Sequence, residues 1–268
     1  MNMKQLRALV HNDLNKIEKI LSAQIDNSNP ISECINIFLQ EKSKRIRSVL
    51  CLLYLKSYGI EINDSILSIL SAGELIHNAS LLHDDVIDNS ELRRNEITVA
   101  KKYSSQISIL SGDYLLCFAV KILMKVNNPS VLDIFLDATK NMCESEFKQY
   151  SNRGKNISVE KYLSIIEGKT ASLFEAILYS TAIISGLDKD NAKMTGKLFG
   201  IIFQINNDMQ PESIKNDKLN GVKTAIDILG IENTRILKDN YKKEMRDKIK
   251  NLPDNEYKQG LEDLTDKL

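Results

Sequence analysis

The chain has 268 residues, enough to bury one large core or two small ones. Its 36 basic residues balance its 36 acidic residues, so the formal net charge is zero, which excludes the electrostatic footprint of a general nucleic-acid-binding protein. With four prolines and 11 glycines, the sequence is poor in residues that break helices, and this favours an all-α fold.

The cysteines and the apolar segments bound the class of protein further. No Cys-x-x-Cys pair occurs, so neither a zinc site nor a disulfide framework is indicated. We expect all four cysteines to be reduced, half-buried core residues of a cytoplasmic protein: Cys34, Cys51, Cys117 and Cys143. The N-terminal segment mixes charged and apolar residues, which indicates an amphipathic helix rather than a signal peptide. The sequence has no run of about 18 apolar residues, so we expect no membrane span.

The first segments predict two helices followed by a basic cluster. Apolar residues recur at helical spacing over residues 3–24, and Pro30 suits the first turn of a second helix. Lys44, Arg45 and Arg47 then directly precede an apolar run. A helix N-terminus carries partial positive charge, so this cluster suits an anion. A solvated basic face remains the alternative for this stretch by itself.

Residues 65–88 predict a long helix that carries three carboxylates at its C-terminal end. Asp84, Asp85 and Asp88 lie at positions i, i+1 and i+4. Residues four apart share a helix face, so Asp84 and Asp88 line one edge and Asp85 flanks them. His77 precedes Asp84 by two turns on nearly the same face.

These carboxylates predict a magnesium-bridged diphosphate site. Clustered acids repel unless a cation lies between them, and Mg²⁺ prefers oxygen ligands and bridges to phosphates. Arg93 and Arg94 follow in a polar loop over residues 89–95, where guanidinium groups suit phosphate oxygens. The alternative is a solvated helix end with ordinary charges, but the apolar residues on both sides of the motif argue against full exposure.

The next helices are expected over residues 111–126, 130–150 and from Ser158, which suits a helix N-cap. The third of them contains Gly168, Lys169 and Thr170. A glycine inside a helix often marks a bend or a close approach, which brings Lys169 and Thr170 within reach of a phosphate. A P-loop is excluded because Leu163 occupies the position of its first glycine and no strand precedes it.

The last part of the chain predicts a helix over residues 191–209, ended by Pro211, and a short helix over 225–229. The lysine- and glutamate-rich C-terminal region is expected to form solvated helical faces. No linker or internal repeat is visible. We therefore expect one domain over residues 1–268, an all-α helical bundle whose central cavity collects the charged residues at its mouth.

The segments SKRIRS, HNASLLHDDVIDNSELRR, EGKT and FQI, in this order, resemble the trans-isoprenyl diphosphate synthase (polyprenyl synthetase) family over about residues 44–224. The likeness is greatest to long-chain, octaprenyl-type members. It implies an isoprenoid synthase-type fold and the condensation of isopentenyl diphosphate with an allylic diphosphate, such as farnesyl diphosphate. The implied product is a medium- or long-chain all-trans polyprenyl diphosphate for quinone side chains, which partitions into membranes. A Mg²⁺ cofactor and a homodimer are implied as well.

The resemblance also implies roles for individual residues. The residues implied to bind metal are Asp84, Asp85, Asp88 and Asp208. Isopentenyl diphosphate would be held by Lys44, Arg47, His77 and Arg94, and the allylic diphosphate by Arg93. The residues implied near the reacting carbons are Lys169, Thr170 and Gln204. The diphosphate leaving group is the implied proton acceptor.

Small side chains before the first aspartate motif bear on product length. Ala79 and Ser80 lie about one turn before Asp84, where an aromatic residue would form the floor of a product tunnel. Small residues leave the tunnel open, which resembles the longer-chain members of the family.

The sequence departs from the family pattern mainly at the second aspartate motif. Asn207, Asp208 and Pro211 stand where three aspartates are expected, so one acid remains. Glu212 or Asp217 is the candidate substitute for a lost carboxylate, and Lys215 is the lysine nearest the expected position. SKRIRS also lacks the usual glycine and proline around its basic residues.

Two alternatives to a long-chain synthase therefore stay open. One is a non-catalytic or regulatory subunit of a heteromeric prenyl diphosphate synthase, favoured by the lost carboxylates. The other is a short-chain synthase that makes farnesyl or geranylgeranyl diphosphate. A terpene cyclase is disfavoured, because its second metal motif would need a serine or threonine and then a glutamate at the positions of Pro211 and Lys215.

Overall fold

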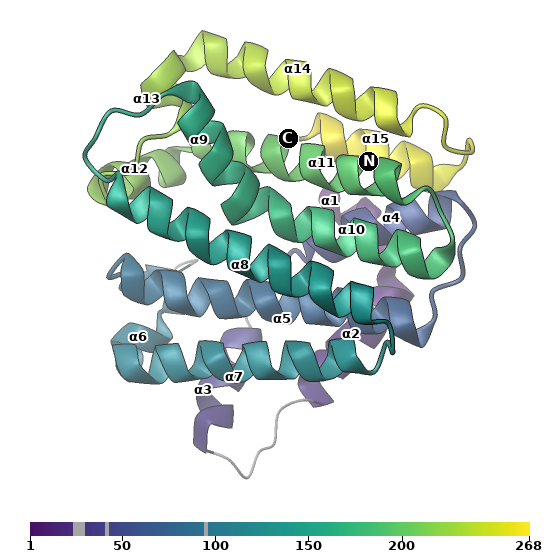
Figure 1. Cartoon of the computed structure of the whole chain (residues 1–268), viewed down its shortest axis with the longest axis horizontal. Helices are drawn as coiled ribbons and strands as arrows, with labels where there is room; N and C mark the ends of the chain where they lie inside the picture. The colour runs from purple at the N-terminus through teal and green to yellow at the C-terminus, as the bar shows by residue number, and fades with distance from the viewer. Residues whose placement is uncertain (24–29, 41–42, 94–95) are drawn as a thin grey trace. The chain divides into compact units, whose positions relative to one another are not determined.

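Helices make up most of the chain, which confirms the predicted all-α class. The computed structural model describes residues 1–23, 30–40, 43–93 and 96–268. Its helices are α1 (Met3–Leu9), α2 (His11–Ala23), α3 (Pro30–Gln40), α4 (Ile46–Ser57), α5 (Asp64–Ile87), α6 (Val99–Lys102), α7 (Ser105–Met124), α8 (Pro129–Ser151), α9 (Val159–Ile166), α10 (Ser172–Ser185), α11 (Lys189–Asp208), α12 (Pro211–Leu219), α13 (Ala225–Leu229), α14 (Ile231–Ile249) and α15 (Glu256–Asp266) (Figure 1). A π-helical segment, η1 (Glu167–Ala171), joins α9 to α10.

The chain divides into two compact units. Unit 1 comprises residues 1–9, 50–61 and 133–268, and unit 2 comprises residues 10–49 and 62–132. The helices α4 and α8 each contribute residues to both units. A single domain with a central cavity stays a prediction.

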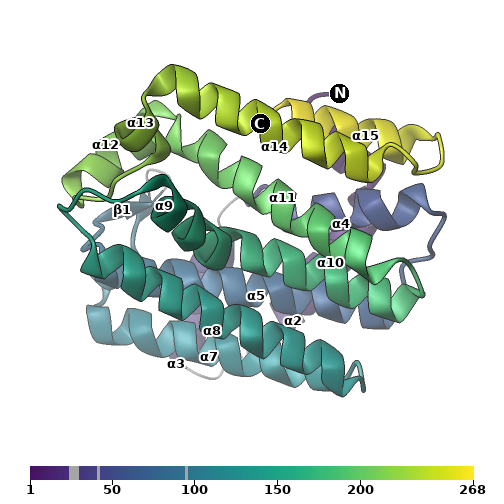
Figure 2. The same ribbon diagram turned by 45° about the horizontal axis from the view of Figure 1, so that its top comes forward.

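Unit 2 is built around the long helix α5. The Asn63 side chain caps its N-terminus by accepting a hydrogen bond from the backbone N–H of Ile66. Its middle is almost wholly buried, from Ile69 to Ile76. Helix α7 packs along α5 in the antiparallel direction, and α2 packs on α5 as well (Figures 1 and 2). Burial of this apolar surface fixes α5 and therefore the position of its C-terminal end.

The C-terminal end of α5 coincides with the aspartate motif. Asp88 is the C-cap residue, and its backbone N–H bonds to the carbonyl of Asp84. Asn89 follows with a φ of 50°, and asparagine adopts this left-handed conformation more readily than most residues. A two-stranded ribbon comes next: β1 (Leu92–Arg93) pairs antiparallel with β2 (Glu96–Ile97).

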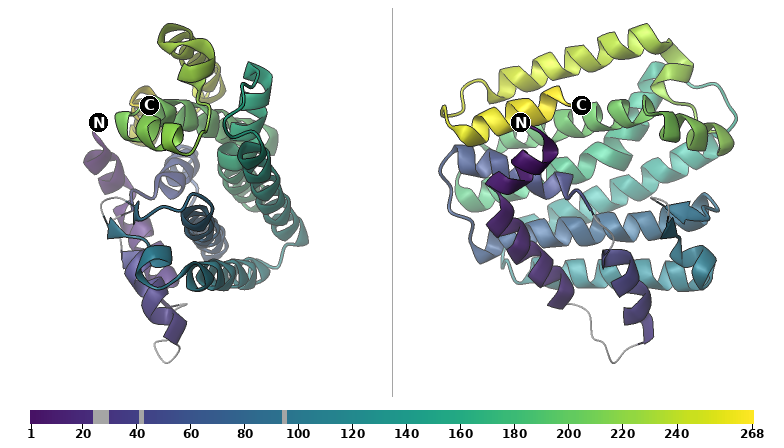
Figure 3. Two further views of the ribbon diagram at one scale, coloured as in Figure 1. Left: turned by 90° about the vertical axis from the view of Figure 1, so that its left-hand side faces the viewer. Right: turned by 180° about the vertical axis from the view of Figure 1, so that it is seen from behind.

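Unit 1 is layered around α11. Helix α10 packs along one side of α11 and α14 along another (Figures 2 and 3). A buried apolar cluster draws its members from α9, η1, α11 and α13: Tyr162, Ile166, Ala171, Ile201, Ile205 and Ala225. This cluster anchors η1 and the C-terminal half of α11, which carry the predicted site residues of this unit.

The element boundaries confirm most sequence predictions and correct four. Ser158 caps α9 and α13 spans residues 225–229, as predicted. The first predicted helix is broken at Val10, and α7 begins at Ser105, six residues early, because Ser104 caps it. The predicted loop after α5 contains β1. The C-terminal region was predicted to form only solvated helical faces, but α14 packs on α11 and buries Met245.

The cysteine prediction was half wrong, because Cys34 and Cys51 are buried but Cys117 and Cys143 are exposed. Two described helices, α5 and α7, are long and apolar enough to cross a membrane by length and composition alone. Core helices of soluble proteins meet the same criteria, and 72% of the most apolar window of α5 is buried inside the protein, against 39% for α7. By themselves these two helices are weak evidence of a membrane span.

Candidate functional site

The aspartate motif of unit 2 is held by an ion pair with the β1 strand. Asp85 is 1% exposed, whereas Asp84 and Asp88 are half-buried. The Nε and Nη2 atoms of Arg93 lie 2.9 Å and 2.8 Å from Oδ1 of Asp85. The short β ribbon thus places the Arg93 guanidinium group beside the Asp85 carboxylate.

The second oxygen of Asp85 is a buried acceptor without a hydrogen-bond partner among the described residues. Burial raises the pKa of the Asp85 carboxyl, the Arg93 guanidinium lowers it, and the charge of Asp88 raises it again. The carboxylates also lie at a helix C-terminus, where the backbone dipole disfavours negative charge. An added cation would relieve all three costs, so the residues fit a metal ion.

Within the described ranges, no three histidine, cysteine, aspartate or glutamate side chains are grouped so that together they could hold a metal ion. Mg²⁺ typically takes one or two protein carboxylates and completes its shell with water and substrate phosphates. The donors would come from Asp84, Asp85 and Asp88.

The three basic residues of this stretch differ in burial and in their contacts. Arg45 is 3% exposed and bonds to Glu18 at 2.8 Å and 3.0 Å and to Glu74 at 3.2 Å. Its φ of 49° is unusual for a residue with a side chain, and these ion pairs hold it there. Lys44 is exposed and Arg47 is 6% exposed.

The Arg47 side chain is more deeply buried than that of His77. Burial lowers the pKa of Arg47 to about 10, although the charge of Glu74 opposes this. His77 is half-buried on α5, two turns before Asp84. Arg94, the fourth residue predicted to hold isopentenyl diphosphate, lies outside the described residues.

Glu74 is a residue of this site that the sequence reasoning missed. Its side chain is 1% exposed, and its oxygens accept hydrogen bonds from Arg45 and, at 2.7 Å, from the Ser48 hydroxyl. A glutamate in the middle of an otherwise apolar helix was the available signal, because buried carboxylates require partners.

In unit 1, Lys169 and Thr170 lie on the π-helical segment. A π-bulge inserts one residue into a helix and is frequent at functional sites. The close approach predicted for Gly168 is confirmed: a Cβ there would lie 1.9 Å from Oγ of Ser145 and 3.1 Å from the Asn141 carbonyl oxygen. Lys169 forms an ion pair with Glu146, a second residue that the sequence reasoning missed.

Thr170, Gln204 and Asp208 are joined by a directional chain of hydrogen bonds. The Thr170 hydroxyl donates to Oε1 of Gln204 at 2.8 Å, and Nε2 of Gln204 donates to Oδ1 of Asp208 at 2.7 Å. The Tyr162 hydroxyl donates to Oδ2 of Asp208 at 2.6 Å. Because Asp208 accepts from the amide nitrogen, it turns the amide oxygen of Gln204 towards Thr170.

Asp208 is 3% exposed, and burial raises its pKa although Tyr162 and Gln204 lower it. Both oxygens of this carboxylate already accept a hydrogen bond, and its role in binding metal stays a prediction. Asn207 is half-buried beside it on α11. Lys215 is exposed on α12. Tyr162 is a further member of this network that the sequence reasoning missed.

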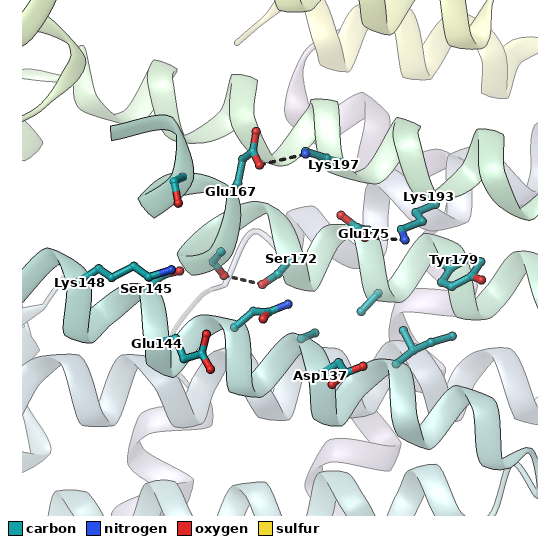
Figure 4. Close-up of a pocket in the computed structure, with 16 residues that line it drawn as sticks. Asp137, Glu144, Ser145, Lys148, Glu167, Ser172, Glu175, Tyr179, Lys193 and Lys197 are labelled. Carbon is teal, nitrogen blue, oxygen red and sulfur yellow. Dashed lines mark hydrogen bonds and ion pairs between the residues drawn. The ribbon is translucent and has the colours of Figure 1, made fainter. Parts of the chain in front are cut away.

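A polar groove of about 410 Å³ lies between α8, α10 and α11 within unit 1 (Figure 4). Ion pairs between Lys197 and Glu167, and between Lys193 and Glu175, lie along it. None of the predicted site residues lines this groove.

Comparison with known proteins identifies the family. The polyprenyl synthetase family model matches residues 28–256, so the chain belongs to the polyprenyl synthetase family. It is 33% identical to the decaprenyl-diphosphate synthase of Dictyostelium discoideum over 87% of this chain, and 30% identical to the octaprenyl diphosphate synthase of Haemophilus influenzae over 82%. The chain spans only 53% of the first relative and 68% of the second.

Three further comparisons give another relative and two structures with the same fold. The chain is 32% identical over 78% of its length to a Bacillus subtilis protein named heptaprenyl diphosphate synthase component 2, of which it covers 61%. The structure of heptaprenyl diphosphate synthase from Staphylococcus aureus matches with a TM-score of 0.89 at 25% identity, over 100% of this chain and 98% of that one. The decaprenyl diphosphate synthase from Rhodobacter capsulatus matches with a TM-score of 0.90 at 24% identity, over 99% and 98%, which shows the fold alone.

Proposed function

We propose that the chain is a prenyltransferase that condenses isopentenyl diphosphate with an allylic diphosphate, such as farnesyl diphosphate. The product is a medium- or long-chain all-trans polyprenyl diphosphate, suited to a quinone side chain and able to partition into membranes. The protein acts in the cytoplasm as a homodimer with Mg²⁺. Family membership and the names of the relatives support this activity.

The observation that carries the proposal is the aspartate motif at the end of α5. Asp85 is almost fully buried, Arg93 pairs with one of its oxygens, and the other oxygen has no hydrogen-bond partner among the described residues. A protein that only needed a stable helix end would not place three carboxylates there. Asp84, Asp85 and Asp88 would hold a cation there, and its charge would compensate the buried oxygen and the clustered carboxylates.

In the proposed reaction, the C1–O bond of the allylic diphosphate breaks and both electrons leave with the diphosphate. The double bond of isopentenyl diphosphate attacks C1 and forms the new C–C bond, and a proton passes to the released diphosphate. Bound Mg²⁺ supplies positive charge that stabilises the leaving diphosphate. The metal is held by Asp84, Asp85 and Asp88.

Different basic residues bind the two diphosphate substrates. Lys44, Arg47 and His77 hold isopentenyl diphosphate, together with Arg94, and Arg93 contacts the allylic diphosphate. Deep burial keeps Arg47 free of competing water, and its pKa of about 10 leaves it charged at neutral pH.

The unit 1 residues act at the reacting carbons. Gln204 presents its amide oxygen in an orientation fixed by Asp208 and shared with the Thr170 hydroxyl. Lys169 supplies positive charge, with Glu146 as its partner. Asp208 is the remaining acid of the second motif and Lys215 its nearest lysine. In this proposal Asp84, Asp85 and Asp88 therefore provide most of the metal binding.

A second candidate function is a partner subunit of a heteromeric synthase. It is favoured by the engagement of Asp208, whose two oxygens accept hydrogen bonds from Tyr162 and Gln204. The relative named as component 2 of a heptaprenyl diphosphate synthase is consistent with an assembly of unlike chains. In that case the chain binds diphosphates but turns over only with a second protein.

One assay separates these functions. The purified chain is incubated with farnesyl diphosphate, labelled isopentenyl diphosphate and either Mg²⁺ or EDTA, and label in the extracted prenyl product is counted. We expect Mg²⁺-dependent incorporation by the chain alone. Absence of product, with binding of both diphosphates retained in equilibrium dialysis, would refute an independent enzyme and favour the partner subunit.

A further inference from the structure

Arg45 directly precedes α4, in a backbone conformation that few residues with a side chain adopt. Its φ of 49° lies in the left-handed region, and its carbonyl accepts a hydrogen bond from the backbone N–H of Val49 at 2.9 Å. Glycine and asparagine adopt this conformation more readily than arginine. The arginine at this position is therefore explained by what its side chain contacts and not by its backbone.

The Arg45 guanidinium group lies between two carboxylates. It donates to both oxygens of Glu18, at 2.8 Å and 3.0 Å, and to Oε2 of Glu74 at 3.2 Å. The Glu18 side chain is 44% exposed, so water solvates part of its charge, whereas the Glu74 side chain is 2% exposed. Glu74 is therefore the acid that most requires a cation, because a buried charge without a partner is costly.

The buried Glu74 carboxylate lies beside residues that we assign to isopentenyl diphosphate. Its other oxygen, Oε1, accepts a hydrogen bond at 2.7 Å from Ser48, which directly follows Arg47 in the first turn of α4. On α5, Glu74 precedes His77 by one turn. The charge of Glu74 also acts on Arg47, because it opposes the lowering of the Arg47 pKa by burial. The guanidinium groups of Arg45 and Arg47 are thus both within range of one buried acid.

Glu74 and a bound diphosphate are alternative partners for Arg47. A guanidinium group pairs with carboxylate and phosphate oxygens through the same N–H donors, so a close pair with one weakens the pair with the other. Because Arg45 already neutralises Glu74, the charge of Arg47 is available to an anionic ligand. The two arginines balance Glu18 and Glu74, so loss of the Arg45 charge would leave one negative charge in excess where an anion has to bind.

We propose that Arg45 and Glu74 are positioning residues of the isopentenyl diphosphate site, in which Arg45 neutralises Glu74 and so leaves the Arg47 guanidinium group to the diphosphate. The inference rests on the proposed function and adds two residues that act through Arg47 and not through contact with substrate. The allylic diphosphate is assigned to Arg93 and the aspartate motif, so its binding is independent of this pair.

A neutral side chain at position 45 tests the charge separately from the shape of the backbone. Glutamine, like arginine, has a Cβ atom, so Arg45→Gln keeps the backbone strain and removes the positive charge. The variant should bind labelled isopentenyl diphosphate about tenfold more weakly in equilibrium dialysis with Mg²⁺, because Glu74 then pairs with Arg47. Its affinity for farnesyl diphosphate should change by less than about twofold. Equal weakening for both substrates, or for neither, would overturn the proposal.

The double variant Arg45→Gln/Glu74→Gln separates positioning from a purely structural role. It removes the competing acid together with its cation, so the affinity for isopentenyl diphosphate should return to within about threefold of the wild-type value. If Arg45 and Glu74 only stabilised the fold, the second substitution would add to the loss caused by the first. A double variant that binds isopentenyl diphosphate no better than Arg45→Gln would therefore refute the proposal.

Asp13→Asn is the matched control. Asp13 is a second buried acid of unit 2, 6% exposed on α2, and Lys16 lies 3.4 Å from its Oδ1 atom. Removal of its charge should leave the affinities for both diphosphates unchanged. If Asp13→Asn weakened isopentenyl diphosphate binding as much as Arg45→Gln does, the effect would be a general loss of buried ion pairs and the proposal would be wrong.

Circular dichroism checks that each variant is folded. If Arg45→Gln does not fold, the single variant Glu74→Gln decides: it removes the competing acid and should bind isopentenyl diphosphate at least as tightly as the wild type, and weaker binding would overturn the proposal. A wild-type protein that binds no isopentenyl diphosphate would refute the proposed function and this inference with it. Normal wild-type binding that none of these substitutions changes would refute this inference alone.

Discussion

Replacing Tyr162 by phenylalanine tests whether Asp208 orients Gln204. The substitution removes one hydroxyl that lies 2.6 Å from Oδ2 of Asp208 and leaves the ring in place. Both side chains are 3% exposed, so water cannot replace the lost donor. The carboxylate keeps Gln204 as a donor at 2.7 Å, while the backbone N–H of Ala225 lies at 3.5 Å.

The expected cost follows from the charge on the acceptor. A hydrogen bond to a charged group contributes about 1.5–3 kcal/mol, so Tyr162→Phe should lower the free energy of unfolding by about that amount at pH 7.5. Urea unfolding followed by circular dichroism measures this change. Prenyl transfer should fall as well, because Asp208 then holds Gln204 less firmly.

The raised pKa of Asp208 determines how the stability loss in Tyr162→Phe changes with pH. Burial holds the folded pKa of Asp208 above its unfolded value, so stability is lost as pH rises from about 4 through the folded pKa. The Tyr162 hydroxyl lowers the pKa of Asp208, so its removal raises that pKa. The pH range over which stability is lost then becomes wider. The loss of stability in the variant should therefore shrink as the pH falls, because protonation of Asp208 reduces the bond to an ordinary one of about 0.5–1.5 kcal/mol.

Tyr54→Phe is the matched control. Tyr54 is also fully buried, but its hydroxyl accepts a hydrogen bond at 3.3 Å from the neutral side chain of Asn191. Its loss should cost the same at pH 5 and pH 7.5. If Tyr162→Phe were equally costly at both pH values, or more costly at pH 5, the reasoning about a charged Asp208 would be wrong.

Three further substitutions test the site. Asp84→Ala should reduce prenyl transfer at least a hundredfold, whereas Asp133→Ala, at an exposed position, should not; an unchanged rate in Asp84→Ala would remove the first motif from the metal site. Ser80→Phe should shorten the product, and an unchanged length distribution in mass spectrometry would end the tunnel argument. Gly168→Ala should destabilise the fold by about 1–3 kcal/mol through its clash with the Ser145 hydroxyl, and Ser145→Ala should restore part of that loss. Urea unfolding that shows no such coupling would mean that this contact does not hold η1 in place.

The parts of the structure that local pattern determines were predictable. The spacing of apolar residues and the Ser158 cap located α9, and the polar residues after Asp88 located the end of α5. The close approach at Gly168 followed from the cost of a glycine inside a helix. Each of these features depends on residues a few positions apart, which is the range that periodicity and capping report.

The features that sequence reasoning missed depend on distant residues or on register. The bond between Tyr162 and Asp208 spans 46 positions, and the pairing of Arg45 with Glu18 spans 27. A π-helical segment changes the register by one residue, which a helical pattern does not reveal. The exposure of Cys117 was missed because the strongly apolar sequence of α7 indicated a half-buried core position for this cysteine.

The most direct test of the account is the length of the product. The wild-type protein is incubated with farnesyl diphosphate, excess isopentenyl diphosphate and Mg²⁺, and the dephosphorylated products are identified by mass spectrometry. We expect all-trans polyprenols longer than geranylgeraniol. Products that stop at geranylgeraniol, or a folded protein that binds both substrates and forms none, would contradict it.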